Sequence, residues 1–399
     1  MTMLTEQTAL ESLSKYIAII NNKEIDIGKS VGAVICGGGA KYFLCAWVCA
    51  NMLRRAGWEY PIQLWHLGDA ELNSGMRKLM SRIDVECVDA HLVRSYRPCR
   101  ILNGWELKPF SIINCPYQEV LSLDADNVPI HSLSPLFSAQ EYLATGAVFW
   151  PDYGRLGRNR KIWSLMGLAY RDEPEVESGQ ILIDKAKCSR PLALTMWMNE
   201  HSDFWYRYIH GDKETFHLAW RKLNIEFAMP SRGIESILGT MCQHDFSGNR
   251  IFQHRNMAKW TIRGNPRVPG FIHEEDCLSL IDQIVPVWEE IAGVKIFDQN
   301  RKSVAERRIA SAVADGIWIY ERVGFDQRPM TFNIDGTIAI GRADQEKYWD
   351  ICASESGVSL LIQSDSLLTC KLMLTDPDRW TGAWERFEQM PISLYRNNT

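Results

Sequence analysis

The stretch EVLSLDADNVPI, from Glu119 to Ile130, joins a short apolar run to two aspartates one residue apart. The apolar part predicts a buried strand, and Asp124 and Asp126 follow where that strand ends. The pair is either a polar turn that closes the strand or two carboxylates that share one cation. The same spacing recurs in Asp376-Pro377-Asp378, where the segment LTDPDRWTG predicts a plain hairpin turn. The surroundings of each pair must therefore decide its role.

Composition excludes several classes of protein. The 399 residues carry a formal net charge of −5 and a pI of about 6.0, so no overall charge attracts the chain to nucleic acid or anionic lipid. The eleven cysteines lack CxxC pairs and zinc spacing, and many fall in apolar segments, so we expect reduced, buried thiols. The N-terminal residues lack a signal-peptide pattern, and no run of about 18 apolar residues predicts a membrane span. We therefore expect a cytoplasmic protein with neither a membrane span nor a nucleic-acid partner.

Strands and helices alternate over the first part of the chain. Helical segments over 41–56, 72–81 and 105–113 separate the apolar strands, which are expected at Val31–Cys36, Ile62–Leu67, Val85–Val88 and Glu119–Leu123. This alternation predicts a mostly parallel α/β sheet, in which ligands gather at the carboxyl ends of the strands. Gly37-Gly38-Gly39 and Asp124-Ala125-Asp126 both follow such ends.

The chain then changes in character. Further strands are expected at Ala144–Trp150, Ser178–Ile183 and Ile251–His254, with helices around 192–205 and 213–223. After about residue 295, NRKSVAERRIASAVA predicts a connecting helix within 296–314. The segments WIYERVG, MTFNIDGTIAIG, VSLLIQS, LLTCKLML and WTGAWERF then alternate and are separated by turn residues. We expect a first domain over 1–295 and a small antiparallel β module over 315–399.

Three other segments carry candidate functional residues. GGGAKY, over 37–42, is either a phosphate-binding turn or a tight strand-to-helix connection, and it does not match GxGxxG. FQHRNMAKW supplies His254 and Lys259, an imidazole for a metal and an ammonium for phosphate, although a lone histidine after a strand is more often structural. HGDKETF places Asp212 and Glu214 at the start of a helix, where capping is the default explanation.

Five segments in this order resemble the yeast-type α-mannosyltransferases, glycosyltransferase family 71, and more distantly the glycogenin and galactosyltransferase group, family 8. The segments are GWELKPFSIINCPYQEVLSLDADNVPI, TGAVFWPD, VESGQILIDK, HGDKETFHLAW and FQHRNMAKW. The resemblance spans roughly residues 30–265. It implies a GT-A fold, a mostly parallel sheet flanked by helices, and metal-dependent, retaining transfer of a hexose from a nucleotide sugar to a glycan or other hydroxyl acceptor.

By this resemblance, Asp124, Asp126 and His254 are the ligands of Mn²⁺ or Mg²⁺, hard cations that suit carboxylate oxygens and neutralise a departing diphosphate. The residues that bind the nucleotide sugar are, by the same resemblance, Gly37, Gly38, Gly39, Tyr42, Lys108, Ala125, Gln180 and Lys259. The segment around Lys259 departs from the HxxGxxKPW pattern of family 8, because its His-to-Lys spacing is one residue shorter and the glycine and proline are missing.

The resemblance also places Asp152, Glu177, Asp212 and Glu214 near the reacting sugar, with Lys213 where family 8 has glutamine. Departure of the diphosphate leaves negative charge at one end and an oxocarbenium-like sugar at the other. The reaction therefore needs cations at the diphosphate and carboxylates near the sugar. Double displacement and front-face attack both stay open.

Mannose from GDP-mannose is the expected donor, and a UDP-hexose used by a retaining glucosyl- or galactosyltransferase is the alternative, because no base-binding signature is readable. A non-catalytic nucleotide-sugar- or glycan-binding protein would lack metal ligands, and all three are present. An NAD-dependent dehydrogenase would need GxGxxG with an acidic residue about 20 positions later, which GGGAKY does not provide. The C-terminal β module is expected to bind acceptor glycan, to mediate dimerisation, or to cap the catalytic domain.

Overall fold

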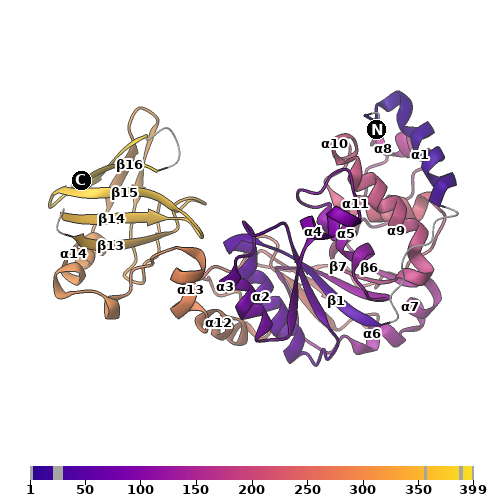
Figure 1. The fold of residues 1–399 in the computed structure, drawn as a ribbon, viewed down its shortest axis with the longest axis horizontal. Helices are drawn as coiled ribbons and strands as arrows, with labels where there is room; N and C mark the ends of the chain where they lie inside the picture. Colours follow the sequence, from indigo (N-terminus) through magenta and orange to yellow (C-terminus); the bar gives the residue numbers. More distant parts are fainter. Residues whose placement is uncertain (1–2, 21–29, 355–356, 386–389, 398–399) are drawn as a thin grey trace. The chain divides into compact units, whose positions relative to one another are not determined.

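The computed structural model describes residues 3–20, 30–354, 357–385 and 390–397. The chain divides into two compact units (Figure 1). The first unit comprises Met1–Trp260 and Arg267–Leu280, and the second comprises Thr261–Pro266 and Ile281–Thr399. The expected β module over 315–399 falls wholly within the second unit.

A six-stranded sheet forms the centre of the first unit. Its strands are β1 (Val31–Cys36), β2 (Ile62–His66), β3 (Val85–Asp89), β4 (Glu119–Asp124), β6 (Ala147–Pro151) and β7 (Val176–Asp184), in the order β3-β2-β1-β4-β7-β6. The first four strands of this order are parallel, and β7 is antiparallel to both β4 and β6. The predicted mostly parallel α/β sheet is therefore confirmed. Because β7 runs the other way, Gln180 in its middle pairs with Leu123 near the end of β4.

Helices pack apolar side chains against this sheet. The helix α9 (Lys185–Glu200) packs against both α5 (Leu107–Asn114) and α11 (Asp212–Lys222), and α11 also packs against β7. Figure 1 shows these three helices gathered together. Phe149 of β6 meets Trp220 of α11 edge to face, with ring centroids 5.0 Å apart. The other helices of this unit are α1 (Glu6–Ile20), α2 (Gly39–Arg55), α3 (Ser74–Ser81), α4 (Ala90–Tyr96), α6 (Ser134–Ser138), α7 (Gln140–Thr145), α8 (Ile162–Met166) and α10 (Ser202–Trp205). The helix α12 (Glu274–Asp282) begins in this unit, and its last two residues belong to the second.

A small antiparallel sheet brings distant parts of the chain together. Its strands are β5 (Asn127–Pro129), β10 (Arg250–His254), β9 (Thr240–His244) and β8 (Glu235–Ile237), in that order. The strand β5 begins one residue after Asp126, and His254 of β10 pairs with Asn127. This register carries His254 to the Asp124–Asp126 segment.

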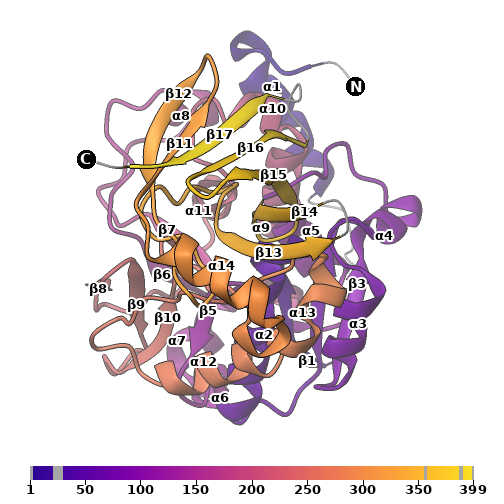
Figure 2. The same ribbon diagram turned by 90° about the vertical axis from the view of Figure 1, so that its left-hand side faces the viewer.

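The second unit is built on a seven-stranded antiparallel sheet. Figure 2 shows its strands in the order β12-β11-β17-β16-β15-β14-β13. They span β11 (Trp318–Arg322), β12 (Asp326–Met330), β13 (Tyr348–Ser354), β14 (Gly357–Gln363), β15 (Leu368–Asp376), β16 (Arg379–Trp384) and β17 (Pro391–Arg396). The unit also contains α13 (Val285–Ala292), the 3₁₀ helix η1 (Gln299–Arg301) and α14 (Val304–Ala314). A capping box between Ser303 and Glu306 starts α14, within the expected connecting segment.

Two expected elements of the first unit begin three or more residues away from their predicted start. Ala144 and Thr145, expected in a strand, end α7 instead, because Gly146 has the left-handed φ of 73° that terminates a helix. The helix expected from Leu192 begins at Lys185, where the Asp184 side chain caps it by accepting the N–H of Ala186.

Several strands of the second unit were not predicted. In β13, the buried Asp350, which forms an ion pair with Lys302 at 2.8 Å, interrupts the apolar run. The segment Met330–Gly341 was expected to alternate around an Asp-Gly turn. Beyond Met330 it forms only isolated bridges, one of which joins Phe332 to Ile338 across that turn. The strand expected in WTGAWERF forms as far as Trp384, and Arg386 and Phe387 lie outside the described residues.

All eleven cysteines are unpaired, and seven of them are buried as expected, whereas Cys36, Cys87, Cys99 and Cys352 are half-buried. Among the residues that the structure describes, no helix combines the length and the hydropathy that crossing a bilayer requires.

Candidate active site

A cavity of about 480 Å³ opens where β1 and β4 end. This is the edge at which ligands of parallel α/β sheets gather. Its walls bring together eleven of the residues singled out in the sequence: Gly37, Gly38, Tyr42, Lys108, Asp124, Ala125, Asp126, Glu177, Asp212, His254 and Lys259.

Asp124, Asp126 and His254 form a compact group of ligand atoms. One ligand atom from each lies within 4.8 Å of the others. The Nε2 atom of His254 is 3.1 Å from Asp126 Oδ1 and 4.0 Å from Asp124 Oδ2. Gly179 of β7 allows this approach, because a Cβ atom there would lie 2.5 Å from His254 Nδ1. Two carboxylates and an imidazole at these separations fit a hard divalent cation such as Mn²⁺ or Mg²⁺.

Asp126 is the more enclosed of the two carboxylate ligands. Burial by itself raises its pKa, but His254 and Lys259 together lower the pKa of Asp126 well below the ordinary value. Burial lowers the pKa of His254, whereas Asp126, Glu177 and Asp124 raise it to about 9. The Nζ atom of Lys259 forms an ion pair with Asp126 Oδ2. Positive charge therefore already surrounds the carboxylate that ends the Asp-x-Asp pair.

Lys108 of α5 joins the metal-ligand group to a second carboxylate. Its buried Nζ lies 2.8 Å from Asp124 Oδ1 and 3.1 Å from Asp212 Oδ2, and it donates to the carbonyl and hydroxyl of Ser178. Burial lowers the pKa of Lys108, but Asp124 and Asp212 raise it above the ordinary value. The lysine therefore stays charged and holds the two carboxylates on either side of it.

Asp212 and Glu214 have different roles at the start of α11. The N-cap of this helix is Gly211, and no side chain caps it there. The Asp212 carboxylate instead accepts a hydrogen bond from Ser178 Oγ at 3.1 Å. Glu214 is buried outside the cavity wall and accepts the backbone N–H of His210 at 3.1 Å. The expected capping role therefore does not hold at the N-cap Gly211, because Glu214 binds the backbone before the helix and Asp212 binds Ser178.

The remaining acidic residues lie at different distances from the cavity. Glu177 lines it, accepts the N–H of Gly179 at 2.8 Å, and has a pKa raised chiefly by burial. Asp152 lies behind the wall and forms an ion pair with Lys213, which does line the cavity and is also 3.4 Å from Glu175. Asp152 therefore acts on the cavity through Lys213.

Two of the expected donor-binding residues lie outside the wall. The amide of buried Gln180 accepts a hydrogen bond from Asn127 at 2.7 Å, which links β7 to β5. Gly39 begins α2, and its N–H donates to the carbonyl of Glu71 at 2.6 Å. Both residues support the cavity from behind.

Comparison with known families identifies the chain. A model of the family Mannosyl_trans3, which is described as a mannosyltransferase family, matches residues 30–173 and 170–259, more than half of the chain. The chain belongs to this family. The Mannosyl_trans3 match contains every residue that lines the cavity and ends at Lys259, so it leaves out the seven-stranded sheet.

Curated relatives carry the same activity in their names. The alpha-1,2-mannosyltransferase MNN2 of Saccharomyces cerevisiae is 26% identical over 276 residues, covering 57% of this chain and 45% of that protein. The alpha-1,2-mannosyltransferase MNN24 of Candida albicans is 26% identical over 262 residues, covering 54% of this chain and 36% of that protein. The matched region spans less than half the length of each of these relatives.

Solved structures show weaker likenesses. The galactosyltransferase LgtC, in complex with donor and acceptor sugar analogues, matches with 15% identity and a TM-score of 0.37 over 49% of this chain and 73% of that chain. The glycosyltransferase GlyE of Streptococcus pneumoniae TIGR4 matches with 12% identity and a TM-score of 0.39 over 72% of this chain and 73% of that chain. At this level we infer nothing further from them.

The cavity of this Mannosyl_trans3 family member is also lined by residues that were not singled out in the sequence. Glu71, Trp105, His210 and Asn256 line it. Glu71 could have been found from its position, because it lies three residues after Gly68, which follows the second predicted strand, and ligands gather at such strand ends. Trp105 and His210 stand at the edges of the quoted segments GWELKPF and HGDKETF, and nothing in the pattern of Asn256 distinguishes it from a loop residue.

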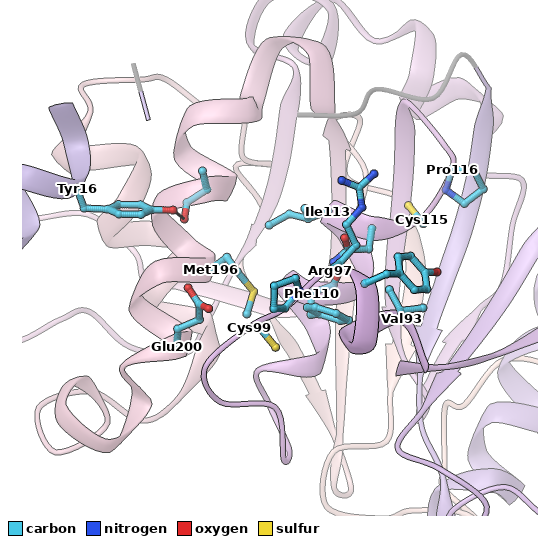
Figure 3. A pocket seen from close by; sticks show the side chains of 14 residues that line it. Tyr16, Val93, Arg97, Cys99, Phe110, Ile113, Cys115, Pro116, Met196 and Glu200 are labelled. Atoms are coloured by element: carbon cyan, nitrogen blue, oxygen red, sulfur yellow. Dashed lines mark hydrogen bonds between the residues drawn. The ribbon is translucent and has the colours of Figure 1, made fainter. Parts of the chain in front are cut away.

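A second cavity of the same unit is more voluminous, about 710 Å³ (Figure 3). Its wall includes Tyr16, Phe110, Met196 and Glu200. Its polar groups already have protein partners, since the Tyr16 hydroxyl donates to the Ala193 carbonyl and Glu200 accepts the backbone N–H of Arg100. We therefore assign the chemistry to the smaller cavity, where charged groups converge.

Proposed function

We propose that the protein transfers mannose from GDP-mannose to a hydroxyl group of a glycan acceptor, with Mn²⁺ or Mg²⁺ bound by Asp124, Asp126 and His254. The observation that carries the proposal is the arrangement of charge in one cavity. A group of metal ligands and Lys259 lie together, and Lys108 connects them to the carboxylate of Asp212. Family membership and the names of the relatives support mannose as the sugar.

The transfer breaks the bond between the anomeric carbon and the diphosphate oxygen and forms a bond from that carbon to the acceptor oxygen. The hydroxyl proton of the acceptor leaves with the departing diphosphate. A bound divalent cation would neutralise the charge that develops on this leaving group. Lys259 and Lys108 add two ammonium groups beside the same region, and Asp212 and Glu177 face the sugar, where positive charge develops.

Retention of the anomeric configuration follows from the same proposal. The mannose of GDP-mannose is α-linked, and the relatives are named alpha-1,2-mannosyltransferases, so an α product would retain the configuration. Lys108 and Ser178 hold the Asp212 carboxylate in one orientation, which suits either retaining route.

Glu71 supports guanine as the base of the donor. One of its oxygens accepts the N–H of Leu67 at 2.7 Å, while the other accepts no hydrogen bond from the part of the chain that the structure describes. Glu71 lies in the wall with Gly37, Gly38 and Tyr42. Guanine presents two neighbouring N–H donors on its pairing edge, whereas uracil presents one donor between two acceptors. A free carboxylate oxygen therefore suits guanine better.

The test is a panel of GDP-mannose, UDP-glucose and UDP-galactose with Mn²⁺, scored for donor hydrolysis and for binding by calorimetry. We expect hydrolysis of GDP-mannose to be fastest, and we expect Glu71→Gln to reduce the preference for GDP over UDP about tenfold. Fastest hydrolysis of a UDP-hexose would support the glucosyl- or galactosyltransferase alternative. Binding of a nucleotide sugar without hydrolysis or transfer would support the non-catalytic alternative.

A further inference from the structure

Trp105 has an exceptional position among the tryptophans of the chain. All fifteen lie in the described residues, and Trp105 alone among them is exposed, with 61% of its surface accessible. It lines the cavity from the short segment between Gly104 and the start of α5. An exposed indole in a cavity wall leaves a large flat apolar surface available to a ligand.

The indole ring is held in place from one side. A Cβ atom at Gly211 would lie 2.8 Å from the Trp105 ring, so the ring rests directly on the backbone of that residue. Gly211 has a φ of 144°, which residues other than glycine rarely adopt. The ring of Tyr206 lies 5.9 Å from that of Trp105, centroid to centroid. These contacts fix the indole immediately before Asp212, the first residue of α11.

The surroundings of Trp105 separate it from the nucleotide. Glu71, Gly38 and Tyr42 line the part of the wall that we assign to the base and ribose. The Tyr42 ring lies 5.5 Å from the Nζ atom of Lys259, which pairs with the metal ligand Asp126. Lys108 lies between the metal ligand Asp124 and Asp212. Trp105 therefore lies on the Asp212 side of Lys108, where the acceptor must approach the anomeric carbon. His210 and Lys213 line the same side and offer polar groups to sugar hydroxyls.

We propose that Trp105 is the platform of the acceptor site and binds the apolar face of a hexopyranose ring at the end of the acceptor glycan. Pyranose rings present one face of C–H groups, which pack against an aromatic plane while the hydroxyls bind polar groups at the rim. The inference rests on the proposed function, because it takes the cavity to be the site of sugar transfer.

Steady-state kinetics with GDP-mannose and an α-mannoside acceptor test the platform. We expect Trp105→Ala to raise the KM for the acceptor about tenfold or more, with a smaller change in kcat and in the KM for GDP-mannose. Trp105→Phe, which keeps an aromatic plane, should recover part of the loss. Tyr60→Ala is the matched control, because Tyr60 is 43% exposed and precedes β2, at the opposite edge of the sheet.

Chemical protection supplies a second readout that needs no turnover. N-Bromosuccinimide should oxidise exposed Trp105 first, and methyl α-mannoside with mannobiose should slow this fast phase in the wild type. In Trp105→Phe the fast phase should be missing, and the sugars should not change the oxidation of the remaining tryptophans. An unchanged acceptor KM in folded Trp105→Ala would overturn the proposed acceptor platform. So would sugars that slow tryptophan oxidation in Trp105→Phe as much as in the wild type. Failure of the wild type to bind or hydrolyse any nucleotide sugar would overturn the proposed function instead, so the two failures are distinguishable.

Discussion

Asp126 and Asp378 end two Asp-x-Asp triplets and have opposite surroundings. Asp126 is buried and lies against His254 and Lys259. Asp378 lies between β15 and β16, where its own N–H donates to Asp376, and its half-exposed side chain pairs with Arg396. The second triplet is therefore the hairpin turn that its residues predict, and the first belongs to a site.

We expect Asp126→Asn to abolish Mn²⁺ binding and to reduce transfer by at least a hundredfold, because a neutral amide is a poor ligand for a hard cation. Asp378→Asn is the matched control and should change neither. Calorimetric titration with Mn²⁺, transfer rates and thermal melts measure the three quantities. Equal, mild effects of the two substitutions would contradict a metal site at Asp126.

Asp212 allows the structural and catalytic explanations to be separated. Asp212→Asn keeps an oxygen that accepts from Ser178 but removes the charge that faces Lys108 and the sugar. We expect kcat to fall roughly 10²–10³-fold, with a much smaller change in donor affinity, because the lost charge acts mainly in the transition state. Single-turnover transfer and donor binding provide the comparison.

Asp172→Asn serves as the control for Asp212→Asn, since the Asp172 side chain is 71% exposed and pairs with Arg155 outside the cavity. A folded Asp212→Asn enzyme with wild-type kcat would remove Asp212 from the catalytic residues. The catalytic role expected for Glu214 stays a prediction, because its buried carboxylate binds the backbone before α11 rather than facing the cavity.

At the scale of elements, α11 connects the cavity to the packing of the first unit. Its first residue, Asp212, faces the cavity, and two later residues, His217 and Arg221, bind the carboxylate of Glu173 at 2.8 Å. This cluster fixes the far turns of α11 to the loop that leads into β7. The position of Asp212 therefore depends on a carboxylate that lies outside the cavity wall.

Glu173 predicts how the stability of the first unit changes with pH. Burial raises its pKa, but His217 and Arg221 lower it from 4.5 to about 2. A carboxyl group whose pKa is lower in the folded chain stabilises it above its unfolded pKa, and this contribution disappears as the pH falls from 4.5 towards 2. We expect Glu173→Gln to lose roughly 2 kcal/mol of stability at neutral pH and little in acid, measured by thermal or denaturant unfolding.

The control for Glu173 is Glu226→Gln. Glu226 pairs with the same Arg221 at 3.2 Å, but its side chain is 70% exposed, so its removal should have a small effect at every pH. Equal loss of stability in both variants would show that the burial of Glu173 does not determine how much it stabilises the first unit.

At the scale of the whole molecule, the two units should respond differently to metal. The cation site lies entirely in the first unit, and the second has its own core of buried side chains that include Trp318, Tyr320 and Trp349. A ligand that binds only the folded state stabilises it by about 2.7 kcal/mol at a concentration of 100 times Kd. We expect Mn²⁺ to raise the unfolding temperature of the first unit and leave that of the second unchanged.

Differential scanning calorimetry with Mn²⁺ and with EDTA measures this difference, and EDTA should also abolish transfer until Mn²⁺ or Mg²⁺ is restored. Full turnover in metal-free buffer would contradict the proposed site. The expected cytoplasmic location and an oligomer formed through the C-terminal β module stay predictions of the sequence.

Local patterns in the sequence determined the strands that end at the cavity. Val31–Cys36 forms β1 with the expected bounds, and Glu119–Leu123 extends by only one residue in β4. Apolar runs bounded by glycine or aspartate predict such strands because burial and turn geometry act within a few residues. Where a buried polar group replaced the apolar pattern, as at Asp350 in β13, the prediction failed.

The sequence by itself thus determined the alternation of strands and helices, the carboxylate pair at the end of β4 and the residue types that a sugar-transfer site needs. Only the tertiary structure decided that β5 and β10 pair so that His254 reaches Asp126, and that antiparallel β7 brings Ser178 to Lys108 and Asp212. It also decided that Glu214 binds the backbone just before α11, whereas Asp212 lines the cavity. The reason is that strand direction and register depend on contacts between residues far apart in the chain, which no local pattern contains.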